Sequence, residues 1–366
     1  MTQAPAEILF ERRGTAGLVT LNRPQALNAV TLGMVRAYTR QLREWQRDPA
    51  ITRIVLAAAG GRAFSAGGDI RALYDAGTGG RHEAMLAFYG EEYVLNTMIK
   101  HYPKPYVSLI DGIVMGGGVG LSVHGSHRVA GDRFSFAMPE VSIGFFPDVG
   151  ATWFLPRLPG ELGTYCALTG ERLGADDAAT TVATHRVQSA RLPELADALC
   201  GAVSVDATLA AFAGLAGEGK AQSKLAASRA AIDRLLKGDR VEDILDALDA
   251  EASGGRDAEF AKTTAAAIRL KSPTSLKLAL AQMRAGAALS FEACMQTEFR
   301  IVSRVIHGHD FYEGVRAVIV DKDNAPRWRP ATLAEVPDAE IARHFAPLPV
   351  GEWAMPNLAG TSADRA

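Results

Sequence analysis

The first half of the chain alternates short apolar segments with stretches of helical periodicity, and this alternation constrains the fold more than any other feature. Residues 17–21 and Arg53–Ala58 are apolar, have the length of a strand and are bounded by turn or charged residues. Between them, apolar side chains recur at helical spacing, namely Met34, Val35, Tyr38, Leu42 and Trp45. Further strands are expected at Tyr106–Ile110, His127–Ala130 and 134–137. The alternation predicts an α/β core.

The second half of the chain has a different character. From residue 175 to 299 it is rich in Ala, Leu, Asp and Arg and has few β-branched runs. Residues 224–237, 241–251 and 290–305 have the pattern of amphipathic helices. We therefore expect a core over residues 1–190, a helical C-terminal region over 191–345 and a loosely ordered tail over 346–366.

Charge and cysteine content narrow the class of protein. The formal net charge is −2, which gives no reason to expect a nucleic-acid or membrane partner. The three cysteines contain no CxxC pair, which argues against a disulfide framework and against a zinc site. The N-terminal residues lack the apolar core of a signal peptide, and no apolar run approaches the ~18 residues of a membrane span. A cytoplasmic protein is expected.

Two glycine-rich segments follow predicted strands. The first, RAFSAGGDIR at residues 62–71, lets backbone N–H groups approach a ligand, and Asp69 is placed to cap a short helix. The second, IVMGGGVGL at residues 113–121, leads from a strand into a helix. Free N–H groups at such turns stabilise negative charge and could form an oxyanion hole. The alternative is a pair of tight turns needed only for close packing.

Carboxylates supply the other candidate groups. Glu140 follows Pro139, and Asp148 follows Pro147, in an apolar stretch where a buried charge needs a partner or a purpose. For each alone, helix capping or an ion pair is the alternative. Glu91 and Glu92 lie in a helical stretch, and a solvated face is their ordinary interpretation. No GxSxG, GxGxxG, P-loop or HExxH motif is complete, so no dinucleotide, nucleotide or metal cofactor is indicated.

Taken in order, these segments resemble one known family. The strings LNRPQALNAV, GGRAFSAGGDI, MGGGVGLSVHG, AMPEVSIGFFPDVG and DFYEGVRAVIVDKDNAPRW are similar to those of the crotonase (enoyl-CoA hydratase/isomerase) superfamily, over about residues 7–345. SVHG, FAMPE, FPDVG and VDKDNAPRW resemble the 3-hydroxyisobutyryl-CoA hydrolase branch. The resemblance implies a spiral of ββα turns with a helical C-terminal region, whose helices cover the site or pack against neighbours. It leaves a homo-oligomer open.

The resemblance also implies roles for single residues. Gly68 and Gly117 would supply the oxyanion donors, and Glu140 would be the catalytic glutamate. Asp148, also counted as catalytic, and Glu92 would hold the substrate hydroxyl and help with proton transfer. The CoA portion of an acyl-CoA substrate would lie along Ala26, Leu27, Ala66, Asp69 and Ile70. No metal or separate cofactor is implied, because CoA arrives with the substrate.

Two departures from the hydratase pattern favour hydrolysis over hydration. Hydratases of this superfamily carry a second glutamate two residues after the triple glycine, where this chain has Gly120, and they have glycine in place of Asp148. The prediction is therefore hydrolysis of a short branched 3-hydroxyacyl-CoA, with Glu140 acting as general base or as nucleophile. The alternatives are an enoyl-CoA hydratase or isomerase, and an acyl-CoA-binding protein without catalysis.

Overall fold

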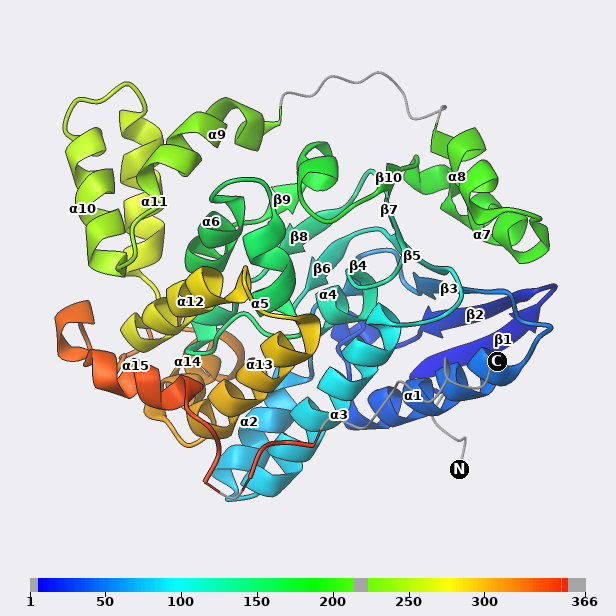
Figure 1. The fold of residues 1–366 in the computed structure, drawn as a ribbon, viewed down its shortest axis with the longest axis horizontal. Coiled ribbons are helices and arrows are strands. Elements are labelled where there is room, and N and C mark those ends of the chain that lie inside the picture. Colours follow the sequence, from blue (N-terminus) through cyan, green and yellow to red (C-terminus); the bar gives the residue numbers. More distant parts are fainter. Residues whose placement is uncertain (1–5, 214–222, 350, 355–366) are drawn as a thin grey trace.

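The computed structural model describes residues 6–213, 223–349 and 351–354 of the 366-residue chain. Two parallel sheets are surrounded by helices, most of them from the second half of the sequence (Figure 1). Within the described ranges, no helix is both long enough and apolar enough to cross a membrane.

Each turn of the chain contributes one strand to each sheet. The three turns contain β3 (Arg53–Ala58) and β4 (Ala63–Ser65), β5 (Tyr106–Ile110) and β6 (Ile113–Met115), and β7 (His127–Ala130) and β8 (Ser135–Ala137). The six-stranded sheet has the order β1-β2-β3-β5-β7-β10, with β1 (Ile8–Arg13), β2 (Ala16–Leu21) and β10 (His185–Arg186). The four-stranded sheet has the order β4-β6-β8-β9, with β9 at Leu173–Gly174. The predicted spiral of ββα turns is confirmed.

Strand pairing follows from these connections. Neighbouring strands are parallel, except for the β1–β2 and β8–β9 pairs at the sheet ends, which are antiparallel. In the large sheet Val55 pairs with Val107, and Leu109 pairs with Val129. Parallel strands need crossover connections, and the helices supply them.

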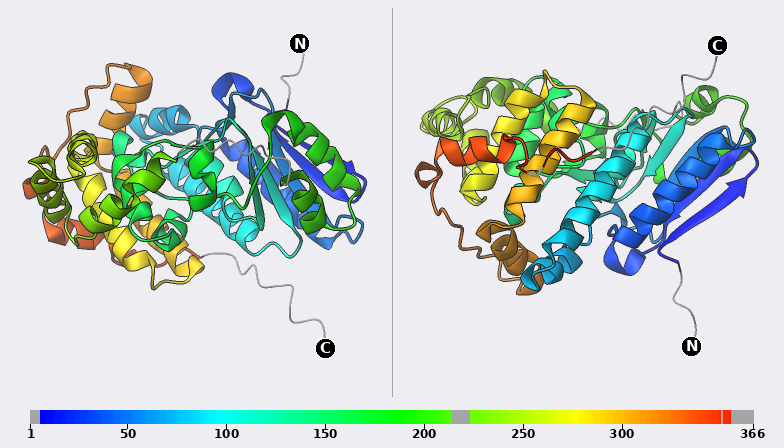
Figure 2. Two further views of the ribbon diagram at one scale, coloured as in Figure 1. Left: turned by 90° about the horizontal axis from the view of Figure 1, so that it is seen from above. Right: turned by 60° about the horizontal axis from the view of Figure 1, so that its bottom comes forward.

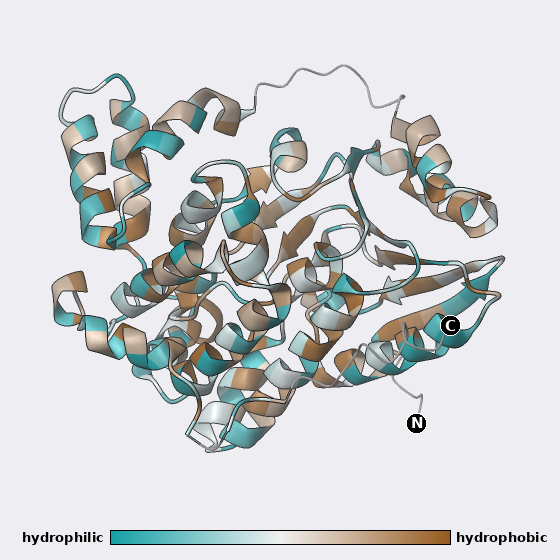
Figure 3. Ribbon diagram, in the orientation of Figure 1, coloured by the Kyte–Doolittle hydropathy of each residue, from teal (hydrophilic) through white to brown (hydrophobic). Residues whose placement is uncertain are grey.

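Helices cover both faces of the large sheet. Its side chains alternate between two cores: Val19, Ile54 and Leu56 belong to the main one, whereas Leu18 and Val55 belong to a smaller one. Helix α1 (Leu32–Arg47) covers the main-core side, and α7 (Leu192–Gly201) and α8 (Val205–Ala213) cover the other (Figure 2). The outward side of α1 is hydrophilic, as expected for a surface helix (Figure 3).

The remaining helices pack mainly on one another, beside the four-stranded sheet. They are α2 (Ile70–Thr78), α3 (His82–Lys100), α4 (Gly117–Ser122), α5 (Ala151–Phe154), α6 (Leu162–Thr169), α9 (Lys224–Leu235), α10 (Val241–Ala252), α11 (Ala258–Arg269), α12 (Pro273–Gly286), α13 (Phe291–Val305), α14 (His309–Val315) and α15 (Asp338–Phe345). The predicted helices at 224–237, 241–251 and 290–305 correspond to α9, α10 and α13. Apolar residues of α12 and α13 belong to the same core as the strands.

The C-terminal segment packs over α13 and α3. Glu352 pairs with Arg300 at 2.7 Å, and the Trp353 ring stacks on Phe299 with centroids 4.8 Å apart. Much of the tail predicted over 346–366 lies outside the described residues. The predicted division at residue 190 stays a prediction.

Candidate active site

The two glycine-rich segments and Glu140 meet at one edge of the four-stranded sheet. Strands β4, β6 and β8 are adjacent and parallel, so the loops after them leave from the same edge. A Cβ atom built on Gly117 would lie 3.2 Å from the backbone nitrogen of Gly68. One built on Gly116 would lie 3.2 Å from Oε1 of Glu140. Segments far apart in the sequence therefore form one site.

Two backbone N–H groups at this edge are available to a ligand. Gly117 is the first residue of α4, and its N–H therefore has no acceptor within the helix. Neither this N–H nor that of Gly68 donates a hydrogen bond within the described ranges. Gly116 has φ 44° and ψ −123°, a conformation that an L side chain rarely adopts, so the turn requires glycine. The pair has the geometry to bind an oxygen that gains negative charge.

Glu140 lies beside the same glycine turn. It begins a short 3₁₀ turn, Glu140–Ile143, immediately after Pro139, and it is 6% exposed. Its Oε2 is buried and has no hydrogen-bond partner among the described residues. Burial, and then the charge of Asp148, raise the pKa of Glu140 well above its usual range. A buried, unpartnered carboxyl group of this kind is typical of a reactive group.

Asp148 lies beside the same space, opposite α3. It is buried, and its Oδ2 accepts a hydrogen bond of 2.9 Å from the Tyr93 hydroxyl. Burial raises the pKa of Asp148 to about 7, although the bond from Tyr93 opposes this shift. The side chain is therefore poised to change its charge near neutral pH.

Three side chains hold the loop that carries Asp148. Both carboxylate oxygens of Glu298 accept backbone N–H groups, from Gly150 at 2.8 Å and from Thr152 at 2.9 Å. Gln282 donates to the Pro147 carbonyl at 2.9 Å, and His124 bonds to the Val149 carbonyl at 2.6 Å. The loop needs this support because Val149 has a left-handed φ of 52°.

Glu298 is a site residue that the sequence analysis missed. It is fully buried in α13, and burial followed by the charge of Asp148 raises its pKa to about 8. The sequence did contain a signal. Glu298 occupies a position on the apolar stripe of this helix, which includes Phe291, Met295 and Val302. A carboxylate on such a stripe needs a specific buried partner.

The two adjacent glutamates of α3, Glu91 and Glu92, have different environments. Glu91 is partly exposed and pairs with Arg36 at 2.6 Å, as expected for a solvated face. For Glu92 the solvated-face interpretation is wrong, because this residue is 2% exposed. Its Oε1 would lie 2.5 Å from a Cβ on Gly117, and burial followed by the charge of Asp148 raises its pKa well above normal. Glu92 therefore lies beside Gly117, and its contact with the substrate stays a prediction.

The segments expected to bind CoA lie side by side. The loop at Ala26 and Leu27 hydrogen-bonds to the strand end of β4, since Ala66 N–H donates to the Leu27 carbonyl at 3.0 Å. Asp69 caps α2 by accepting from Ala72 N–H at 3.1 Å, as predicted, and it also pairs with Arg23 at 2.8 Å. Its carboxylate is thus engaged within the protein. A role for Ala26, Leu27, Ala66, Asp69 or Ile70 in CoA binding stays a prediction.

Space around Gly120 is closed. A Cβ atom on this residue would lie 2.7 Å from Cβ of Val149 and 2.8 Å from Nδ2 of Asn96. Real Cβ atoms do not approach other atoms so closely. The position where hydratases carry their second glutamate is therefore filled, in this chain, by Asn96 and by the loop after Asp148.

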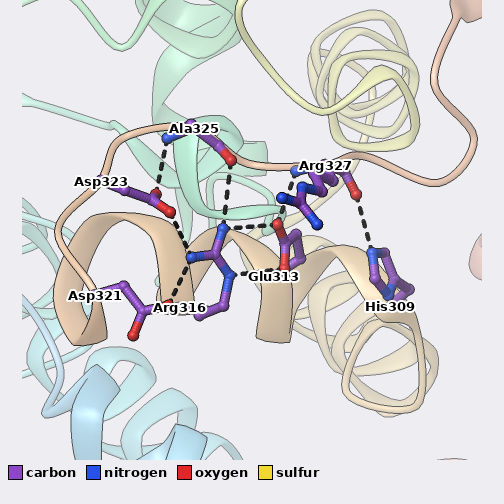
Figure 4. A network of polar contacts seen from close by, with 7 residues as sticks. All are labelled: His309, Glu313, Arg316, Asp321, Asp323, Ala325 and Arg327. Carbon is purple, nitrogen blue, oxygen red and sulfur yellow. Dashed lines mark hydrogen bonds and ion pairs between the residues drawn. The ribbon is translucent and has the colours of Figure 1, made fainter.

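The string DFYEGVRAVIVDKDNAPRW, at residues 310–328, packs against the turn that begins at Glu140. In α14 a Cβ on Gly314 would lie 2.3 Å from the backbone carbonyl carbon of Ile143, so helix and turn are in direct contact. A polar network fixes the segment after α14 to this helix (Figure 4). At its centre Arg316 pairs with Glu313, Asp321 and Asp323 at 2.7–2.9 Å. The network therefore holds the segment after α14 against the helix that contacts the Glu140 turn.

Comparisons with known proteins agree with this geometry. The enoyl-CoA hydratase/isomerase family profile matches residues 16–345. The 3-hydroxyisobutyryl-CoA hydrolase, mitochondrial, of Danio rerio is 46% identical and covers 95% of this chain and 91% of its own length. That of Homo sapiens is 42% identical and covers 95% of this chain and 90% of its own.

Solved structures share the whole fold. A carnitinyl-CoA dehydratase from Mycobacterium thermoresistibile has a TM-score of 0.88 at 42% identity and covers 96% of this chain and 100% of its own. An enoyl-CoA hydratase from Rhodobacter sphaeroides has a TM-score of 0.87 at 38% identity and covers 95% of this chain and 100% of its own.

One expectation is contradicted. The sequence analysis placed the chain in the cytoplasm, whereas these curated relatives are named as mitochondrial proteins. The absence of a signal-peptide core from the N-terminal residues does not distinguish the cytoplasm from a mitochondrion. The fold, the site and the relatives agree on one assignment: the chain belongs to the enoyl-CoA hydratase/isomerase family, in the branch of the 3-hydroxyisobutyryl-CoA hydrolases.

Proposed function

We infer that this chain is an enzyme that hydrolyses 3-hydroxyisobutyryl-CoA to 3-hydroxyisobutyrate and CoA. The observation that carries this inference is the meeting of two N–H groups, from Gly68 and Gly117, that donate to no described residue, with the buried carboxyl group of Glu140. The buried Asp148 is close enough for its charge to raise the pKa of Glu140. The names of the curated relatives support the same reaction. A role in valine catabolism follows from this substrate and is part of the proposal.

In the proposed mechanism, the thioester oxygen binds between the Gly68 and Gly117 N–H groups. Charge develops on this oxygen when the carbonyl carbon is attacked, and the two donors stabilise it. Loss of one such donor typically costs about 10²–10³ in rate. Glu140 either takes a proton from the attacking water or attacks the carbonyl carbon itself. The C–S bond then breaks, and the thiolate of CoA takes up a proton.

The two routes differ in the origin of the product oxygen. If Glu140 attacks, it forms an acyl anhydride that water then opens. When water attacks the glutamyl carbonyl of this anhydride, a reaction in ¹⁸O-water places the label in the Glu140 carboxyl group, and the label accumulates over several turnovers. In a single turnover, attack there gives a product with an unlabelled Glu140 oxygen. A general base never exchanges oxygen with the substrate. Mass spectrometry of the peptide that contains Glu140 separates the routes when label is found there.

Hydration of an enoyl-CoA is the second candidate, because the solved neighbours are titled as a dehydratase and a hydratase. The closed space at Gly120 argues against it. No carboxylate can extend from this position while Asn96 and Val149 occupy the adjoining space. Addition of water to a double bond would have to proceed without the paired glutamates, and we expect it to be slight.

Thiol release measured over a panel of acyl-CoA thioesters tests the proposal. We expect 3-hydroxyisobutyryl-CoA to be hydrolysed faster than isobutyryl-CoA, since a site that binds a hydroxyl can reject the analogue without it by up to ~10⁴–10⁵. Equal turnover of the two would contradict the proposed substrate. Efficient loss of crotonyl-CoA absorbance would favour the hydratase, and no thiol at all would favour a binding protein. We predict that the chain needs no metal and no separate cofactor, and that it binds no nucleic acid. A homo-oligomer also stays a prediction.

A further inference from the structure

Four buried side chains share one face of α3. Tyr89, Glu92, Tyr93 and Asn96 are spaced at i, i+3, i+4 and i+7, and each is at most 2% exposed. Tyr93 bonds to Asp148, and Glu92 approaches Gly117. This face of the helix is therefore a wall of the proposed active site.

Tyr89 differs from its neighbour Tyr93 in one respect. Its hydroxyl is buried and has no hydrogen-bond partner among the described residues. An unpartnered buried hydroxyl costs free energy, so such groups are rare unless a ligand or a water molecule completes them. Tyr102 provides a contrast, since its hydroxyl donates to the Leu42 carbonyl at 2.9 Å.

Aromatic packing fixes the position of the Tyr89 ring. The ring stacks on Phe145, with centroids 5.4 Å apart and planes at 20°. It also meets the edge of Phe88 at 5.4 Å, and Phe88 in turn lies against Gly68, where an added Cβ would be 3.2 Å away. Phe145 belongs to the segment between Glu140 and Asp148. The Tyr89 ring is thus held between Phe88, which lies against Gly68, and the segment that carries Glu140 and Asp148.

The hydroxyl lies among carboxyl groups and remains protonated. Burial, and then the charges of Asp148 and Glu92, raise the pKa of Tyr89 well above its usual range. A phenol in this state is a hydrogen-bond donor. Tyr89 keeps this donor whatever the charge of the neighbouring carboxyl groups, whereas a carboxyl group can donate only while it is protonated and can only accept once it is ionised.

We propose that Tyr89 determines specificity by donating a hydrogen bond to the 3-hydroxyl oxygen of the acyl group, while Asp148 or Glu92 accepts the proton of that hydroxyl. A hydroxyl has one proton to donate and two lone pairs to accept with, so a site whose carboxyl groups are ionised would leave the substrate oxygen without a donor. The proposal rests on the proposed function and adds a residue to it.

The test is Tyr89→Phe in the full-length chain, with kcat and KM measured by thiol release. We expect kcat/KM for 3-hydroxyisobutyryl-CoA to fall by at least about tenfold. Turnover of isobutyryl-CoA, which has no hydroxyl, should stay within about threefold of the wild type. The Tm should not fall, because the lost hydroxyl bonds to no residue that the structure describes.

Tyr102→Phe is the matched control. It removes a hydroxyl that does bond within the protein, so it should lower the Tm and leave the preference between the two substrates unchanged. If Tyr89→Phe keeps the wild-type preference, or reduces turnover of both substrates equally, the specificity role is wrong while the hydrolase function stands. If the wild type releases no thiol from 3-hydroxyisobutyryl-CoA, both the proposed function and this inference fail.

Discussion

Gly117→Ala tests the pair of backbone donors with the smallest possible change. The new Cβ would lie 2.5 Å from Oε1 of Glu92 and 3.2 Å from the Gly68 nitrogen. An ordinary contact is about 3.5 Å, so the Glu92 carboxylate must retreat by about 1 Å, which a flexible side chain can do. The methyl group would then stand where an oxygen within ~2.7–3.1 Å of both nitrogens has to bind.

The expected result is a folded protein with little activity. Gly117 does not have a left-handed φ, and alanine in a helix is favoured over glycine by roughly 0.5–1 kcal/mol, which offsets the displacement of Glu92. We expect the Tm to change little and kcat, measured by thiol release, to fall by about 10²–10³.

Gly33→Ala is the control for this substitution. Gly33 is an exposed residue of α1, and its added Cβ would meet nothing closer than Thr31 Oγ1 at 3.7 Å. It should leave kcat unchanged. If Gly117→Ala keeps kcat within a few-fold of the wild type, the triple-glycine turn serves close packing and the reasoning about the donors is wrong.

Three further predictions follow from the surroundings of the site. Asp148→Asn keeps an acceptor for Tyr93 but removes the charge, so thiol release should fall by at least ~10² while the Tm is unchanged or raised; wild-type turnover would contradict its role. Gly314→Ala places a Cβ 2.3 Å from the carbonyl carbon of Ile143. It should lower the unfolding free energy by about 1–3 kcal/mol and should also lower kcat. An unchanged melting curve would show that α14 does not pack tightly against the Glu140 turn. For Glu298 the folded pKa, about 8, is above the ordinary 4.5, so the folded state holds a proton that the unfolded chain has released. The stability that depends on this proton is fully present below pH ~4.5 and is lost as the pH rises toward 8. Because glutamine does not titrate, the Tm of Glu298→Gln minus that of the wild type should increase between pH 5 and 8. A Tm difference that stays constant with pH would contradict the pKa shift.

Hydrophobic periodicity was sufficient to predict the longer elements. The strands β3, β5 and β7 have the predicted bounds, and α10 and α13 differ from theirs by one residue at one end. Strand β4 is only three residues long, too short for an alternating pattern to be recognised. Strand β1 carries charged residues at the sheet edge, which disguise it.

The environment of single side chains was harder to predict. Nothing local distinguishes Glu92 from Glu91, because burial in α3 depends on which face meets α4 and α13. The capping of α2 by Asp69 was predicted, but the pairing of its carboxylate with Arg23 was not. Such partners come from segments distant in sequence, and only the fold brings them together.

The central claim is that Glu140 performs the chemistry beside the two backbone donors. The most direct measurement is kcat for thiol release from 3-hydroxyisobutyryl-CoA by Glu140→Gln, with the fold checked by thermal unfolding. Glutamine keeps the shape but can neither take a proton nor attack as a carboxylate. The account predicts a fall in kcat of at least ~10² with a Tm equal to or above that of the wild type. A folded Glu140→Gln protein that releases thiol at a near-normal rate would contradict it.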